Sequence, residues 1–264
     1  MNKIMKKDVV AGLGEIGLPI LKLISKKENA VGYDLDKKLM NEKKFSKLEN
    51  SQTRFLHIAI PVNKNFISNV IQLYKKLQPE CIVIHSTISP GTTEKIQKKL
   101  QIPIIFSATR GVHKRMLQDL KRYVKFFAIS RNAPKKYWAV SKYRESMKKC
   151  GIKTQQMSKP ETLELAKILC DTSYLGWLIN YAQLTNTIAL EHNVDYDEMW
   201  EFSDEIHKFL GNRPKMFPGF IGGHCVIPNL ELIQNQTLDL IKSINQKYSK
   251  QVQNSKTIHK KYTQ

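Results

Sequence analysis

The chain has 264 residues, of which 41% are hydrophobic and 25% charged, a composition typical of a folded globular protein with one large domain or two of ordinary size. No apolar run approaches the roughly 18 residues of a membrane-spanning helix, so a membrane span is excluded. The formal net charge of +20 favours anionic ligands such as dinucleotides, nucleotide sugars or nucleic acid, but the lysines are scattered along the chain and select no partner.

The N-terminus runs from a few basic residues directly into an apolar strand without a cleavage-site pattern, which predicts a cytoplasmic protein. The four cysteines are widely spaced, with no C-x-x-C pair and no His/Cys cluster at metal-ligand spacing; they are Cys81, Cys150, Cys170 and Cys225. This spacing predicts free thiols and no metal site.

Short β-branched runs alternate with amphipathic stretches between residues 8 and 156, which predicts an α/β fold with a doubly wound parallel sheet of the Rossmann type. The expected strands are Asp8–Ala11, Ala30–Tyr33, Phe55–Ile60, Cys81–His85, Ile104–Phe106, Phe126–Ile129 and Lys153–Gln156. The clearest helix of this region is Phe66–Lys76, whose apolar residues recur at helical spacing.

From Lys159 onward the pattern is helical, and one apolar stripe continues from Pro160 to about Asn193. Further helices are expected at Asp195–Leu210 and Leu230–Lys247, on either side of a loop at Gly211–Pro228. The predicted domains are a Rossmann-type domain over residues 1–157, an all-helical domain with a long central helix over residues 158–248, and a basic, disordered tail over residues 249–264. Because the stripe exceeds what the other helices can cover, we expect a homodimer.

Three glycines, Gly12, Gly14 and Gly17, follow the first strand and open the next helix in a G-x-G-x-x-G pattern. In this context they permit a tight turn, the approach of a pyrophosphate to the backbone, and close packing of helix on strand. The pattern predicts a dinucleotide site. The alternative is that the glycines serve packing alone.

Asp34 stands at the end of the second strand, twenty-two residues after Gly12. A carboxylate there accepts hydrogen bonds from the adenosine ribose and repels a 2′-phosphate, so NAD is favoured over NADP. Lys37 and Lys38 weaken this repulsion, and the alternative role of Asp34 is to cap the next helix.

Three more segments follow the glycine loop, GLGEIGLP, in order: HSTISPGTTEKI (His85–Ile96), PETLELAKILCDTSYL (Pro160–Leu175) and PGFIGGHCVIPN (Pro218–Asn229). Together they resemble the UDP-glucose/GDP-mannose dehydrogenase family, which has an S-T-x-x-P-G-T turn, a K-x-x-x-N helix and a G-G-x-C loop. The resemblance spans nearly the whole chain. It implies NAD-dependent oxidation of a sugar alcohol to an acid by two hydride transfers, with the intermediate aldehyde trapped by a thiolate.

The resemblance implies that Cys225 is the nucleophile, that Lys167 stabilises the developing oxyanion, and that Thr87 positions water near the thioester. We expect Cys225 to react before Cys81 or Cys170, which lie on an apolar strand and helix. The alternatives are that Cys225 is a small buried residue and that Lys167 is a solvated helix charge paired with Glu164 and Asp171. The predicted cofactor contacts are Gly12, Gly14, Glu15, Ile16, Gly17, Asp34, Pro61, Ser86 and Thr87.

The sequence departs from the family pattern at two matched positions. Asp171 stands where the family has asparagine, and Asn229 stands where it has aspartate, so a carboxylate and a carboxamide are exchanged. If the two side chains share the site, its total charge is preserved. The family's acidic P-E-like segment is replaced by residues Ala108–His113, where His113 is either a substitute general base or an exposed residue at a helix start.

Family members also carry a third, C-terminal α/β domain that holds the substrate nucleotide, and we expect this chain to lack it. Either another protein supplies that surface, or the substrate is smaller, or the protein only binds. The implied function is therefore an NAD-dependent oxidoreductase resembling a truncated nucleotide-sugar dehydrogenase. The alternatives are a two-electron hydroxyacid-type dehydrogenase, a non-catalytic dinucleotide-binding regulatory protein, and a nucleic-acid-associated protein, which is disfavoured because no aromatic-basic platform is visible.

Overall fold

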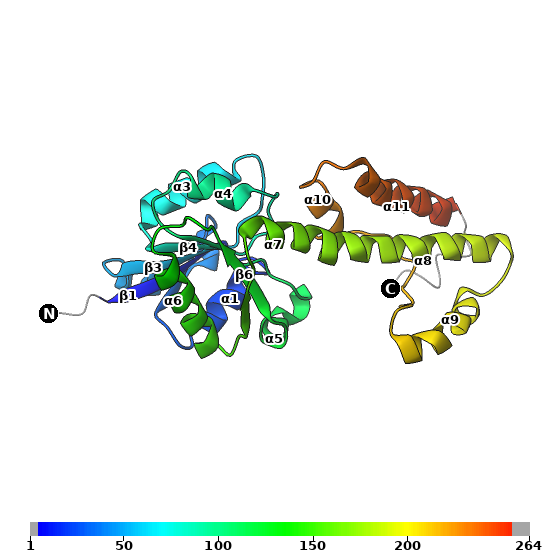
Figure 1. Ribbon diagram of the computed structural model, residues 1–264, viewed down its shortest axis with the longest axis horizontal. Helices are drawn as coiled ribbons and strands as arrows, with labels where there is room; N and C mark the ends of the chain where they lie inside the picture. Colours follow the sequence, from blue (N-terminus) through cyan, green and yellow to red (C-terminus); the bar gives the residue numbers. More distant parts are fainter. Residues whose placement is uncertain (1–4, 255–264) are drawn as a thin grey trace. The chain divides into compact units, whose positions relative to one another are not determined.

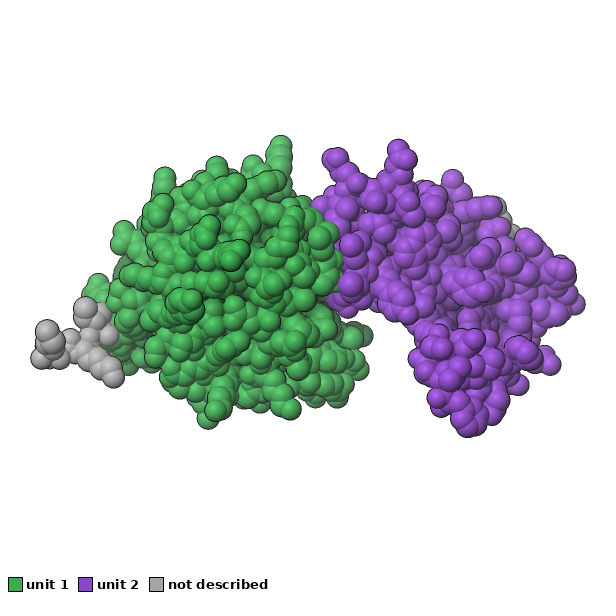
Figure 2. Space-filling model, in the orientation of Figure 1, with its two compact units in different colours: residues 1–167 green, residues 168–264 purple. Residues whose placement is uncertain are grey.

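The computed structural model describes residues 5–254, and the chain divides into two compact units, residues 1–167 and 168–264 (Figure 2). The first unit is built on a seven-stranded sheet in the order β2-β1-β3-β4-β5-β6-β7. Its strands are β1 (Lys6–Ala11), β2 (Ala30–Tyr33), β3 (Gln52–Ile58), β4 (Cys81–Ile84), β5 (Ile104–Phe106), β6 (Lys125–Ile129) and β7 (Thr154–Gln156). The predicted α/β fold and all seven predicted strands are confirmed.

The expectation of a wholly parallel sheet is wrong at one pairing, because β6 runs antiparallel to β5. Lys125, the first residue of β6, donates from Nζ to the carbonyl of Ser107, directly after β5, at 3.1 Å. Strand β6 therefore begins at the edge of the sheet where β5 ends. The segment between them does not cross back over the sheet, as a parallel connection would require.

Helices cover both faces of this sheet (Figure 1). Their bounds are α1 (Gly17–Ile24), α2 (Glu42–Lys47), α3 (Phe66–Leu77), α4 (Thr92–Gln97), α5 (Met116–Arg122), α6 (Lys136–Lys149) and α7 (Pro160–Ala166), with short 3₁₀ turns η1 (Lys37–Leu39) and η2 (His113–Arg115). Val10 packs into one core with residues of α1, α5 and α6, whereas Val9 and Ala11 pack into a second with residues of α3 and α4. Burial on both faces explains why the strands read as continuous apolar runs.

The first unit extends beyond residue 157 because α7 packs against β5 and β6. The chain then continues through a π-helical segment, η3 (Lys167–Ser173), into α8 (Tyr174–Glu191). The long helix expected from Pro160 is thus present, but its hydrogen-bond pattern changes within it. Two hydroxyls bond to carbonyls one turn back: Thr172 Oγ1 to Ile168 O at 3.0 Å and Ser173 Oγ to Leu169 O at 2.9 Å. Such bonds compete with the backbone ladder and bend helices.

The second unit is completed by α9 (Tyr196–Leu210), α10 (Val226–Leu230) and α11 (Gln236–Asn254). The single final helix expected at Leu230–Lys247 is wrong, because a break separates α10 from α11. Asn235 causes it by capping α11, since its side chain accepts hydrogen bonds from the N–H groups of Thr237 and Leu238.

The expected loop at Gly211–Pro228 ends earlier than predicted, at the start of α10. Helix α11 occupies the beginning of the predicted tail, and the rest of that tail lies outside the described residues. Across residues 5–254, none of the helices combines the length and hydropathy that a bilayer crossing requires.

Lys125, at the start of β6, is a buried lysine. Its Nζ donates to Ser107 O and to Thr109 Oγ1, both at 3.1 Å, and only 6% of the residue is exposed. Burial, together with the nearby charges of Arg110 and Lys167, lowers the pKa of Lys125 to about 7. A cation here is therefore disfavoured in the folded protein near neutrality.

We predict that Lys125→Met removes a pH-dependent loss of stability. A lysine with a lowered folded pKa binds fewer protons when folded, so its unfavourable effect is greatest below about pH 7 and fades as the pH rises toward its unfolded value. Urea denaturation should show that the free energy of unfolding of the wild type, relative to that of Lys125→Met, rises by up to about 1.4 kcal/mol per pH unit between about pH 7 and 9. Parallel stability curves for the two proteins would contradict this account.

Candidate functional site

The glycine loop after β1 has the backbone that a dinucleotide turn needs. Gly12 has φ +86, and a Cβ there would lie 2.5 Å from the carbonyl oxygen of Ala59. Gly17 packs so closely on Gly12 that no side chain fits. Gly14 is exposed, and a Cβ there would meet nothing within 4 Å. The loop is therefore tightly packed behind and open in front, where a ligand can approach the backbone.

Asp34 holds this loop in place. Its Oδ2 accepts a hydrogen bond from Leu13 N at 2.7 Å, and its Oδ1 accepts one from Asp36 N at 3.0 Å. The alternative that Asp34 caps the next helix is wrong, because Asp36 caps η1 through Lys38 N. A carboxylate has about four lone-pair sites, so Asp34 can still accept from a ribose hydroxyl.

The remaining predicted cofactor contacts follow the next two parallel strands. Pro61 is exposed after β3, and Thr87 is half-buried after β4. Ser86 Oγ donates to the carbonyl of Ile60 at 2.7 Å, which joins the two loops. Because β1 to β4 are parallel, these residues, the glycine loop and Asp34 lie along one edge of the sheet, where open α/β sheets bind ligands.

His113 lies beside the glycine loop. It begins η2, is half-buried, and its Nδ1 lies 2.8 Å from Oε2 of Glu15. The alternative of a solvent-exposed His113 therefore fails, although it does stand at a helix start. An imidazole in contact with this loop is placed at the edge of the sheet where proton transfer would be useful.

Lys167 ends α7 and begins the π-helical segment η3, which also contains Asp171. Both side chains are half-buried. π-helical turns are rare and occur often at functional sites. The surface ion pair between Lys167 and Glu164 does not form, because Glu164 is completely buried. It bonds instead to Gly91 before α4 and to Thr93 in the first turn of that helix.

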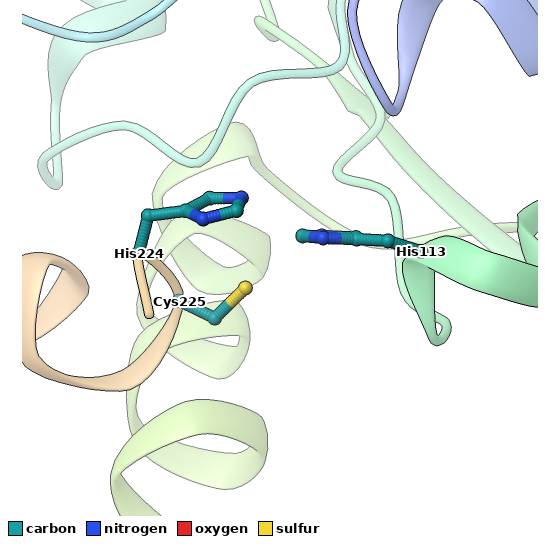
Figure 3. A group of neighbouring side chains, drawn as sticks. All are labelled: His113, His224 and Cys225. Carbon is teal, nitrogen blue, oxygen red and sulfur yellow. The ribbon is translucent and has the colours of Figure 1, made fainter. Parts of the chain in front are cut away.

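In the second unit, Cys225 and its neighbour His224 stand at the start of α10 (Figure 3). Both are exposed, so the alternative of a buried structural cysteine fails. Gly223, with φ +72, makes the turn that presents them. Asn229 lies half-buried within α10, close in sequence to the cysteine.

A buried amide network holds the loop before Cys225. Asn245 of α11 accepts from Ile221 N at 2.8 Å and donates to Ile221 O at 3.0 Å, so one side chain satisfies both backbone groups. Gln183 of α8 donates to Gly219 O at 2.7 Å and to Asn245 Oδ1 at 3.0 Å. Asn180 donates to Gln183. A loop without strand or helix partners is thereby fixed on two helices.

Sequence reasoning missed this network and Glu164. The available signal was polar side chains on an apolar helix face: Asn180, Gln183 and Asn186 follow one another at three-residue spacing in the long helix, and all three are buried. Buried amides need partners, so these positions indicated a neighbour that supplies hydrogen bonds.

No family model and no curated protein matches the sequence, but solved structures do. The UDP-D-ManNAc dehydrogenase of Pyrococcus horikoshii is 18% identical with a TM-score of 0.76, over 94% of this chain and 70% of that one. The UDP-N-acetyl-mannosamine dehydrogenase Cap5O of Staphylococcus aureus is 19% identical with a TM-score of 0.67, over 94% and 69%. A 3-hydroxyisobutyrate dehydrogenase of Mycobacterium tuberculosis is 14% identical with a TM-score of 0.65, over 95% and 94%.

These likenesses define the class of fold: a Rossmann-type unit followed by a helical unit, as in nucleotide-sugar and hydroxyacid dehydrogenases. More particularly, the chain shares its fold with about 70% of the length of two UDP-sugar dehydrogenases. Its own G-G-x-C loop stands at the start of α10.

The thiols give a first prediction about reactivity. Burial raises the pKa of Cys81 and of Cys150, whereas Cys170 and Cys225 are exposed, so the expectation that its helix protects Cys170 is wrong. A limiting dose of iodoacetamide should label Cys170 and Cys225 well before the other two, because the thiolate is the reactive form. Peptide mass spectrometry measures this order, and Cys225→Ser is the control. Labelling of Cys81 at the rate of Cys225 would contradict it.

Proposed function

We propose that this protein is an NAD-dependent oxidoreductase that oxidises an alcohol group of a nucleotide-sugar-like substrate to a carboxylate. The observation that carries the proposal is the glycine loop: Asp34 fixes it through Leu13 N at 2.7 Å, and Gly14 leaves its outer side open. The likeness to UDP-sugar dehydrogenases supports the substrate class.

The charge distribution supports an anionic cofactor. Most of the 43 lysine and arginine residues lie within residues 1–167, whereas the 23 acidic residues are divided more evenly between the two units. The positive field therefore belongs to the unit with the glycine loop. Such a field raises the local concentration of anions and their association rate.

The proposed chemistry proceeds in balanced steps. The alcohol loses a hydride to NAD and a proton to a base, which gives an aldehyde. The Cys225 thiolate would add to the aldehyde to give a thiohemiacetal anion. This anion would give a second hydride to a second NAD, which leaves a neutral thioester. Water then cleaves the carbon–sulfur bond, releasing the carboxylate and restoring the thiol.

The other residues receive roles from the resemblance. Lys167 stabilises the oxyanion and Thr87 positions the attacking water. Asp171 and Asn229 supply one carboxylate and one carboxamide in exchanged positions. His113, joined to the loop through Glu15, is the candidate base for hydrolysis, because an imidazole exchanges protons near neutrality.

A second function, a single hydride transfer on a hydroxyacid, is favoured by one observation. The 3-hydroxyisobutyrate dehydrogenase shares its fold over 94% of its own length. Such a reaction needs Lys167 but no thiol. The two functions differ in the number of NADH molecules formed per substrate and in their need for Cys225, whereas a regulatory protein that only binds the dinucleotide would form none.

Cofactor choice tests the proposal at its central residue. NAD should bind more tightly than NADP, because the Asp34 carboxylate accepts from a ribose hydroxyl and repels a 2′-phosphate. Asp34→Ala should weaken NAD binding by about tenfold or more, since a charged hydrogen bond contributes about 1.5–3 kcal/mol. The same variant should reduce the difference in affinity between NAD and NADP. Calorimetry measures both constants, with Asp36→Ala as the control. Equal binding of NAD and NADP by the wild type would refute this role.

We also propose a homodimer formed through α8. Its outer face exposes large apolar side chains, among them Tyr181 at 58%, Leu184 at 51% and Ile188 at 43%. A groove of about 550 Å³ runs between α8 and α11 and includes these residues. Apolar surface of this kind marks an interface, and a second copy offers the same self-complementary face.

Light scattering at micromolar concentration should therefore give twice the chain mass of 30.5 kDa. Leu184→Glu should shift the protein to monomer, because a carboxylate would be buried without a partner. Leu210→Glu makes the same substitution at an exposed leucine at the end of α9. It is the matched control and should leave the dimer intact. A wild type that stays monomeric at every accessible concentration would rule the dimer out.

A further inference from the structure

Glu164 is a buried carboxylate that the proposed reaction does not use. It lies in α7 and has no exposed surface. Its Oε2 accepts from Gly91 N at 2.6 Å, and its Oε1 accepts from Thr93 N at 3.0 Å and Thr93 Oγ1 at 2.6 Å. Among the described residues no cation pairs with it, so the three donors alone compensate its burial, which raises the pKa of Glu164.

These donors come from Gly91, which ends the turn between β4 and α4, and from Thr93 in the first turn of α4. The turn contains Ser86 and Thr87 and ends at Gly91, whose φ is +80 and which gives α4 no side-chain cap. The N–H groups at the start of a helix need acceptors. Glu164 supplies them from a different helix, so the conformation of the turn depends on the position of α7.

The same helix carries Lys167, one turn after Glu164. The two residues are three positions apart and share a helix face. A single carboxylate thus connects the turn that presents Thr87 to the helix that presents Lys167, all within the first unit.

We propose that Glu164 is a positioning residue that holds Ser86 and Thr87 in register with Lys167. This inference rests on the proposed function, which places NAD along the carboxyl edge of the sheet. The strand order β2-β1-β3-β4 puts Asp34 at the adenosine end, so the turn after β4 lies toward the nicotinamide end. Glu164 therefore positions residues at the nicotinamide half of the cofactor site and does not affect the adenosine half.

The test compares NAD with ADP-ribose, which lacks the nicotinamide. Glu164→Gln places a donor opposite the N–H and O–H donors of the turn, so a hydrogen bond is lost and a buried group is left unsatisfied. Calorimetry should show NAD binding weakened about tenfold, while ADP-ribose binding stays unchanged. A purely structural role would weaken both ligands alike or neither.

Matched variants complete the experiment. Glu161→Gln, on the same helix but half-buried and paired with Lys159, should bind both ligands like the wild type. Thr93→Val is a milder change that serves if Glu164→Gln does not fold, and it should likewise weaken NAD binding but not ADP-ribose binding. Thr93→Ser should bind NAD like the wild type because it keeps the hydroxyl.

Equal loss for NAD and ADP-ribose, or no loss for either, would overturn the positioning role while leaving the proposed function in place. A wild type that binds neither ligand would instead refute the proposed function itself. The two failures are thus distinguishable from the same set of titrations.

Discussion

The hydrogen bond from Leu13 N to Asp34 Oδ2, at 2.7 Å, is the interaction on which the proposed dinucleotide site depends. It fixes the loop after β1 to the end of β2, and the backbone bond from Gly12 N to Tyr33 O at 2.9 Å continues the same pairing. The loop is thus held from behind, while the space in front of Gly14 is open to the N-terminal end of α1. N–H groups at the start of a helix lack partners within the helix. Those groups, together with the helix dipole, are what a pyrophosphate binds.

The other functional loops are held by the same physical means, a buried polar side chain in place of a strand partner. Glu164 satisfies the turn after β4, and Asn245 satisfies both backbone groups of Ile221 in the loop before Cys225. Each of these side chains is costly to bury unless every hydrogen bond forms. Satisfied networks of this kind rigidify the loops that present reactive groups, which is what preorganised sites require.

The parts of the fold that are local in sequence could be predicted from it. The glycine loop and Asp34 stand at a characteristic spacing in one βαβ unit, and the strand at Ala30–Tyr33 matches the structure residue for residue. The start of α11 was missed although its signal, the Asn235 cap, is also local. The apolar periodicity from Leu230 onward suggested one continuous helix and so concealed the start of α11 at Gln236.

The remainder depends on contacts between distant residues. The antiparallel direction of β6 goes with the hydrogen bond between Lys125 and the end of β5. The spacing of strands along the sequence does not reveal this hydrogen bond. Glu164 has the sequence context of a surface helix charge, yet it faces a turn seventy-one to seventy-three residues away. The exposure of Cys170 depends in the same way on which helix face its neighbours cover.

The count of NADH formed per molecule of nucleotide sugar consumed tests the account most directly. Wild-type protein mixed with NAD and a panel of nucleotide sugars should form two NADH for each substrate that it oxidises, and Cys225→Ser should lose the second, because the aldehyde is no longer held as a thiohemiacetal. A protein that binds NAD but forms no NADH with any sugar or hydroxyacid would contradict the assignment of an oxidoreductase.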